Sequence, residues 1–206
     1  MIRSGRVFRW LLVMVLVGAT GAFGAQHVDY AKTIAPLIDP AKLATLRARG
    51  ANPRVQKYVY WLAEAQKAGM SPDKVAADAV AKVGMSGDAA KLTVAAMVRN
   101  RDIAEKLGCL DATGLDGMRR GKSPVVKKGP YAGQGLSVDH IIPRAVCPEL
   151  DNVIASLELL PLRVNESKND KIGDRQRDLA AKLFEAGLLA RKGSQRSGNE
   201  PTSPTT

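Results

Sequence analysis

The order of apolar and polar positions divides the chain into a helical N-terminal part and a C-terminal part in which short apolar runs alternate with loops. Over residues 31–107, apolar side chains recur at the three- and four-residue spacing of an amphipathic helix. The clearest stripe consists of Val55, Tyr58, Val59, Leu62 and Ala65. A second helix is expected after Ser71 and Pro72, since serine caps a first helical turn and proline fits its first position. The pattern predicts a helical region over residues 25–107.

A change in composition after Gly108 marks the end of this region. A third helix, over about residues 88–107, is expected to stop at this glycine. Residues 111–135 then hold six glycines and two prolines, a composition typical of loops. One short strand is expected there, around Val125 and Val126.

The rest of the chain returns to short regular elements. Residues 136–143 predict a strand, and helices are expected over about residues 161–170 and 174–190. The predicted fold class is therefore α+β and mostly helical. Its two parts are the helical region over residues 25–107 and a second module over residues 108–190.

Both ends of the chain are expected to lie outside the folded part. Residues 1–24 combine three arginines, an apolar run over residues 10–17 and a series of small residues, which is the pattern of a secretory signal peptide cleaved before Ala25. This predicts a secreted or periplasmic protein, the alternative being an uncleaved segment that anchors it to a membrane. Residues 191–206 have almost no side chain able to join a core, which predicts a disordered tail.

The charge of the chain indicates a polyanionic partner. Lys and Arg number 31 against 20 Asp and Glu, giving a net charge of +11 and a pI near 9.9. Cleavage of the signal would remove three arginines and leave +8. Residues 116–128 carry five basic side chains and one acid, a net +4. These basic residues are Arg119, Arg120, Lys122, Lys127 and Lys128.

The small number of cysteines and histidines limits the possible chemistry. Two cysteines, Cys109 and Cys147, exclude a disulfide-dense scaffold, and in an oxidising compartment they could form one bridge or remain small buried side chains. Two histidines exclude a site built from three imidazoles. Because His27 lies near the expected mature terminus, His140 is the remaining candidate for a catalytic imidazole.

The residues that could carry chemistry are concentrated between positions 136 and 171. Asp139 and His140 adjoin within an otherwise apolar strand, and Asn165 lies three residues before Lys168 on an expected helix. A carboxylate, an imidazole, an amide and an ammonium are the groups that phosphodiester hydrolysis uses. Oxygen ligands hold a divalent cation, an imidazole takes a proton from water, and a cation contacts phosphate.

This arrangement resembles the HNH endonuclease family over about residues 119–175. The resemblance implies a ββα-metal module, in which a hairpin and a following helix hold one divalent metal ion. It makes His140 the general base, Asp139 and Asn165 the metal ligands, and Lys168 a phosphate contact. The oxygen ligands favour Mg²⁺ or Mn²⁺.

One position departs from the family pattern. The asparagine that orients the base in the family lies nine residues before the last ligand, and Ser156 stands at that place here. Either the shorter Ser156 hydroxyl orients His140, or Asn152, four residues earlier, takes over the role.

The resemblance and the signal peptide together imply a secreted, metal-dependent endonuclease, with DNA favoured over RNA. The charge of positions 119–128 predicts that their basic residues contact the phosphate backbone. Two alternatives belong to other classes. One is a nucleic-acid-binding relative without turnover, suggested by Ser156. The other is a basic envelope protein that binds an anionic polymer or lipid, suggested by the charge and the signal peptide alone.

Overall fold

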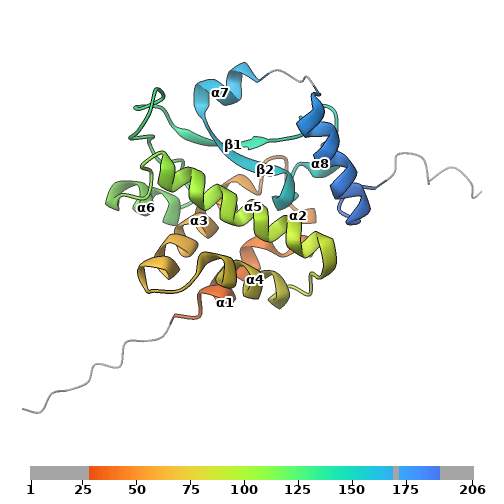
Figure 1. The fold of residues 1–206 in the computed structure, drawn as a ribbon, viewed down its shortest axis with the longest axis horizontal. Coiled ribbons are helices and arrows are strands. Elements are labelled where there is room, and N and C mark those ends of the chain that lie inside the picture. Colours follow the sequence, from red (N-terminus) through yellow and green to blue (C-terminus); the bar gives the residue numbers. More distant parts are fainter. Residues whose placement is uncertain (1–27, 169–171, 191–206) are drawn as a thin grey trace, which may run out of the picture.

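The structure is a computed structural model that describes residues 28–168 and 172–190 (Figure 1). The signal peptide predicted over residues 1–24 and the tail predicted over residues 191–206 therefore lie outside the described residues. Within them the chain is mostly helical and contains one two-stranded antiparallel sheet, which confirms the predicted α+β class.

The N-terminal part consists of packed helices, as predicted. They are α1 (Tyr30–Ile38), α2 (Pro40–Ala44), α3 (Asn52–Lys67), α4 (Pro72–Lys82) and α5 (Gly87–Lys106). The predicted stripe of α3 is buried along its whole length, from Val55 to Ala65. The start of α4 is also as predicted, because the Ser71 side chain accepts a hydrogen bond from the Lys74 amide. Gly108, with φ of 70°, follows the C-terminal end of α5.

The C-terminal part contains one helix that the glycine-rich sequence did not predict. This helix, α6 (Ala112–Arg119), begins where the Asp111 carboxylate accepts the Gly114 amide at 2.7 Å. Gly114 is required for packing, since a Cβ atom would lie 1.9 Å from the Cys109 carbonyl oxygen. The remaining elements are β1 (Leu136–His140), the short 3₁₀ turns η1 (Pro148–Leu150) and η2 (Ile154–Ser156), β2 (Leu157–Pro161), α7 (Leu162–Ser167) and α8 (Asp174–Glu185). Near the predicted strand at Val125, an isolated bridge pairs that residue with Gly135.

The two strands form a hairpin with different faces. Leu136, Val138, Leu157 and Leu159 lie on one face and belong to the main hydrophobic cluster. The opposite face carries Asp139, directly across from Glu158. Helix α7 follows β2 directly, so the order strand, connection, strand, helix is present.

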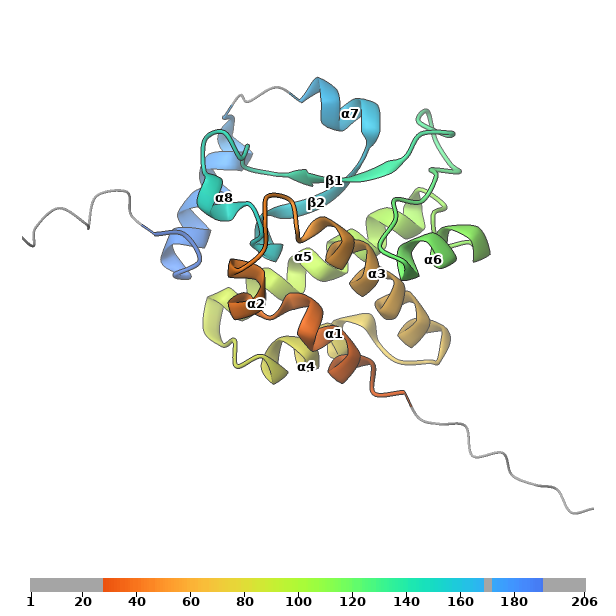
Figure 2. The same ribbon diagram turned by 180° about the vertical axis from the view of Figure 1, so that it is seen from behind.

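The hairpin and the N-terminal helices share one core rather than forming separate units. Buried residues of α1, α3, α4 and both strands belong to the same cluster, and the hairpin lies across α3 and α5 in both views (Figures 1 and 2). Gln56 Nε2 donates to the Leu136 carbonyl at 3.0 Å. On the other edge, the Asn100 amide bonds the Leu157 carbonyl at 3.1 Å and the Leu159 amide at 2.9 Å. These side chains satisfy backbone groups that a two-stranded sheet leaves unpaired.

The cysteines lie in different parts of the structure. Cys109 is fully buried in the main cluster, and Cys147 packs against a smaller cluster around Ile142 and Leu183. The structure forms no bridge between them. Burial raises the pKa of the Cys109 thiol to about 11.

Across residues 28–168 and 172–190, no helix has the length and apolar character needed to cross a membrane.

Candidate active-site groove

A groove of about 490 Å³ opens at the C-terminal end of β1. Its polar lining comes from the hairpin, from α7 and from the loop that precedes α3. These residues are Arg49, Asp139, His140, Arg144, Asn165, Glu166 and Lys168. The structure therefore brings together four residues that the sequence predicts for the site: Asp139, His140, Asn165 and Lys168.

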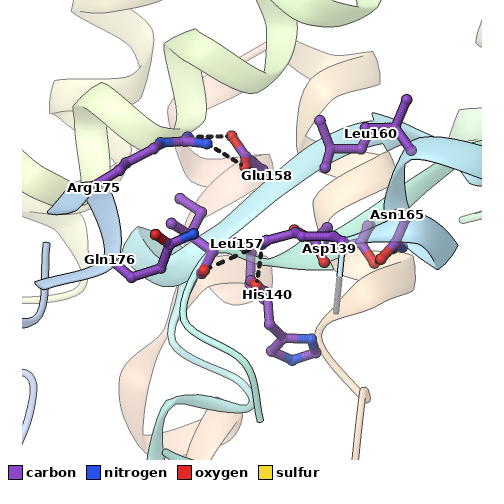
Figure 3. A network of polar contacts seen from close by, with 12 residues as sticks. Asp139, His140, Leu157, Glu158, Leu160, Asn165, Arg175 and Gln176 are labelled. Atoms are coloured by element: carbon purple, nitrogen blue, oxygen red, sulfur yellow. Dashed lines mark hydrogen bonds and ion pairs between the residues drawn. The ribbon is translucent and has the colours of Figure 1, made fainter. Parts of the chain in front are cut away.

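Asp139 and His140 both reach this groove because they end the strand. Neighbouring strand residues point to opposite faces, so Asp139 faces α7 while His140 shares the face of its partner Leu157. Beyond His140 the pairing stops after one further bond, from the Ile141 amide to the Ser156 carbonyl at 2.9 Å. Figure 3 shows the two side chains leaving adjacent positions in different directions. The groove wraps around the strand end and takes in both.

His140 is held by Asp151, a residue that the sequence analysis missed. His140 Nε2 lies 2.9 Å from the Asp151 carbonyl oxygen and 2.9 Å from its carboxylate Oδ1. The other carboxylate oxygen accepts the Arg49 amide at 3.0 Å. Both the His140 and Asp151 side chains are largely buried, with 11% and 13% exposed. Asp151 lies in the turn between η1 and η2, and no sequence pattern indicates that this turn folds back onto the end of β1.

Asp139 is buried and paired with Lys168. The Lys168 ammonium contacts the Asp139 carboxylate and also donates to the His140 carbonyl at 2.7 Å and the Ile141 carbonyl at 3.2 Å. Burial raises the pKa of the Asp139 carboxyl above its ordinary value, although the Lys168 ammonium opposes this rise. Lys168 thus fastens the turn after β1 while neutralising the carboxylate beside it.

The second carboxylate on this face is neutralised separately. Glu158 lies opposite Asp139, and two like charges at this spacing would repel each other. Arg175 of α8 forms a fork onto Glu158, with N–O distances of 2.9 and 2.5 Å (Figure 3). Glu158 therefore forms an ion pair with Arg175 that holds α8 against the hairpin.

Asn165 is oriented by the strand that it faces. Its Nδ2 donates to the Ser137 hydroxyl at 2.9 Å and to the Val138 carbonyl at 3.5 Å. Since the amide nitrogen is used there, the carbonyl oxygen is the atom that can serve as a ligand in the groove. Figure 3 shows Asn165 beside Asp139.

The oxygens of Asp139 and Asn165 are the donors that could hold a hard divalent cation. Mg²⁺ is commonly bound by one or two protein oxygens, with water and phosphate completing the shell. A more complete cage is absent, because the described residues contain no group of three or more His, Cys, Asp or Glu side chains able to hold a metal. The donor set fits Mg²⁺ or Mn²⁺ and does not fit a structural zinc site.

Neither of the two residues predicted to orient the base contacts the His140 side chain. The Ser156 hydroxyl is buried and has no hydrogen-bond partner among the described residues. Asn152 instead accepts the Ala51 amide at 2.9 Å and donates to the carbonyls of Leu46 and Arg47. The contacts to His140 that were expected from Ser156 or Asn152 are instead made by the Asp151 carbonyl and carboxylate oxygens.

The basic residues predicted for nucleic-acid binding do not line the groove. Arg119 and Arg120 both form ion pairs with Asp116 on the surface of α6. Lys122, Lys127 and Lys128 lie in the segment between α6 and β1, also outside the lining. The cationic residues at the groove, besides Lys168, are Arg49 and Arg144, which no sequence motif singles out.

Comparisons with models of known protein families, with curated proteins and with solved structures gave no match to this chain. The support for a function therefore comes from the groove itself and from the resemblance of its residues to the HNH pattern. The groove offers a buried imidazole, two oxygen donors and cationic side chains within one solvent-open space.

Proposed function

We propose that this chain is an exported, metal-dependent nuclease that hydrolyses phosphodiester bonds of nucleic acid, with DNA favoured over RNA. The observation that carries the proposal is the contact of His140 with Asp151, next to Asp139 and Asn165 in one groove. An imidazole fixed by a carboxylate, beside oxygen donors and cations, is suited to attack on an anionic ester.

His140 would act as the general base. Its Nε2 faces two oxygens, so the neutral ring carries its proton on that nitrogen and keeps the lone pair on Nδ1. Nδ1 would take a proton from a water molecule as the water oxygen attacks phosphorus. The bond from phosphorus to the 3′ oxygen then breaks, and that oxygen takes up a proton from solvent water. Asp151 holds the ring in this tautomer and stabilises the imidazolium that forms.

Asp139 and Asn165 would hold the divalent cation. When bound, Mg²⁺ or Mn²⁺ would polarise the phosphoryl group and stabilise the charge on the departing oxygen. Lys168 occupies one side of Asp139 and keeps the carboxylate in place relative to the turn that carries His140.

Cleavage of supercoiled plasmid DNA by residues 25–206 tests the proposal. Cleavage is expected with Mg²⁺ or Mn²⁺ and is expected to stop in EDTA. His140→Ala should lower the rate by about 10²–10⁴-fold, because it removes the general base. His27→Ala removes the other histidine of the chain and serves as the matched control, with unchanged activity. Equal rates for His140→Ala and wild type would refute the general-base assignment.

Nucleic-acid binding without turnover is the second candidate, and the unsatisfied Ser156 hydroxyl favours it. A site that lacks its family's orienting amide could retain binding and lose catalysis. This candidate predicts salt-sensitive DNA binding with no cleavage under any metal. A large gain in rate on Ser156→Asn would support it, because the native site would then lack its orienting group.

A further inference from the structure

The loop before α3 contains an unusual backbone position beside the groove. Arg49 has φ of 59°, and it is the one residue other than glycine with positive φ among the described residues. The next residue, Gly50, lies in a crowded place, where an added Cβ would lie 2.7 Å from the Leu46 Cβ. A side chain at Arg49 is thus kept at a backbone position that glycine would occupy more easily. Such positions are concentrated at functional sites.

Contacts to the turn that carries Asp151 hold this loop in place. The Arg49 amide donates to Asp151 Oδ2 at 3.0 Å, and the same carboxylate contacts His140 through Oδ1. Asn152, the next residue, bonds the Ala51 amide and the carbonyls of Leu46 and Arg47. The Asp151 carboxylate therefore links the His140 imidazole to the backbone of Arg49 and fixes the position of His140 relative to Arg49.

The Arg49 side chain lines the same groove as Asp139, His140 and Asn165. It forms no ion pair with a carboxylate among residues 28–168 and 172–190, whereas Lys168 of the same groove is paired with Asp139. A guanidinium presents several N–H donors in a rigid fork that matches two phosphate oxygens.

We infer that Arg49, contributed by the N-terminal helical region, binds the phosphate that is attacked in the groove. This inference rests on the proposed nuclease function and extends the site beyond the part of the chain that resembles HNH enzymes. It also gives the N-terminal helices a role in the site: they support the loop that carries the phosphate-binding residue.

Arg49→Gly is the most informative variant, because glycine adopts the left-handed conformation without strain. Its thermal midpoint should stay within about 3 °C of wild type. Its kcat/KM on plasmid DNA with Mg²⁺ should fall about 10- to 100-fold, as expected for loss of a hydrogen-bonded charge. Arg49→Lys should retain an intermediate rate, since it keeps the charge and loses the fork. Arg47→Ala is the matched control, because Arg47 is exposed in the same loop and does not line the groove.

Binding of a fluorescein-labelled DNA duplex in EDTA separates this inference from the proposed function. Weaker binding and slower cleavage by Arg49→Gly, with Arg47→Ala like wild type, would support the inference. Wild-type cleavage by a folded Arg49→Gly protein would overturn it and leave the nuclease function standing. A wild-type protein that neither binds nor cleaves DNA would overturn both.

Discussion

Two polar clusters contact the hairpin, and they differ in their exposure to solvent. Asn100 is fully buried, and its amide is used completely: Nδ2 bonds Tyr58 and the Leu157 carbonyl, and Oδ1 accepts the Leu159 amide. At the strand end, His140 uses Nε2 on Asp151 and borders an open groove. The first cluster closes a sheet edge, whereas the second borders the solvent-open groove of the proposed site. Buried polarity alone therefore does not indicate a candidate site; the two clusters differ in whether they open to solvent.

The largest effect on folding is expected from Asn100→Ala. The change would leave the Leu159 amide without its hydrogen-bond acceptor in the core. It would also remove one hydrogen-bond donor from the Leu157 carbonyl. The free energy of unfolding should fall by about 3 kcal/mol, measured by urea denaturation. Lys91→Ala on the exposed face of the same helix is the control and should change stability by less than about 0.5 kcal/mol. A minor loss for Asn100→Ala would show that the sheet edge does not depend on this amide.

Asp151→Asn should have the opposite profile, with an effect on turnover larger than its effect on folding. The amide preserves the size of the side chain and removes the charge that, in the proposed mechanism, stabilises the imidazolium. We expect kcat to fall about 10- to 100-fold while KM stays nearly constant. Glu149→Ala is the control, since Glu149 is an exposed acid two residues away in the chain. Should KM rise with kcat unchanged, Asp151 would be acting on substrate binding and not on His140.

The two cysteines also differ in their exposure to solvent, which their rates of alkylation can measure. At pH 8 a thiol with a pKa of about 11 is about 10⁻³ ionised, so Cys109 should resist alkylation through both its pKa and its burial. Ionisation increases as the pH rises toward that pKa, so the rate at Cys109 should increase with pH. Cys147 is half-buried and should be modified first. Mass spectrometry of iodoacetamide-treated protein measures this order, and early labelling of Cys109 in folded protein would show that the core opens.

The smallest effect is expected from Ser156→Ala. The Ser156 hydroxyl is buried without a hydrogen-bond partner among the described residues, so its removal costs no bond. Both the cleavage rate and the midpoint of unfolding should remain close to wild type. A large loss of activity would instead assign Ser156 the orienting role that the HNH resemblance suggests.

Much of the fold could be predicted because local signals determine it. The α3 stripe and the Ser71 cap depend on spacing and on residues close in the chain, and the structure confirms both. Helix α6 was missed because its glycines are typical of loops, while Gly114 in fact meets the tight approach of the Cys109 carbonyl. The sharing of one core by helices and hairpin depends on long-range contacts such as Gln56 with Leu136, which no local pattern reveals.

Some residues of the groove could be predicted from the sequence and others could not. Asp139, His140, Asn165 and Lys168 could be selected because they lie within one short stretch of sequence. Asp151 and Arg49 could not, because they are about a hundred residues apart and meet only through the folded turn and loop. The positive charge near position 120 lies outside the groove, and Asp116 pairs with two of its arginines.

Chemical rescue of a His140→Gly protein tests whether His140 is the general base. Free imidazole can enter the space left by the side chain and accept the proton from water in its place. Added imidazole should restore part of the metal-dependent DNA cleavage by His140→Gly, leave the wild-type rate unchanged and not rescue Asp139→Ala. Cleavage by His140→Gly at the wild-type rate without imidazole would show that His140 is not the general base.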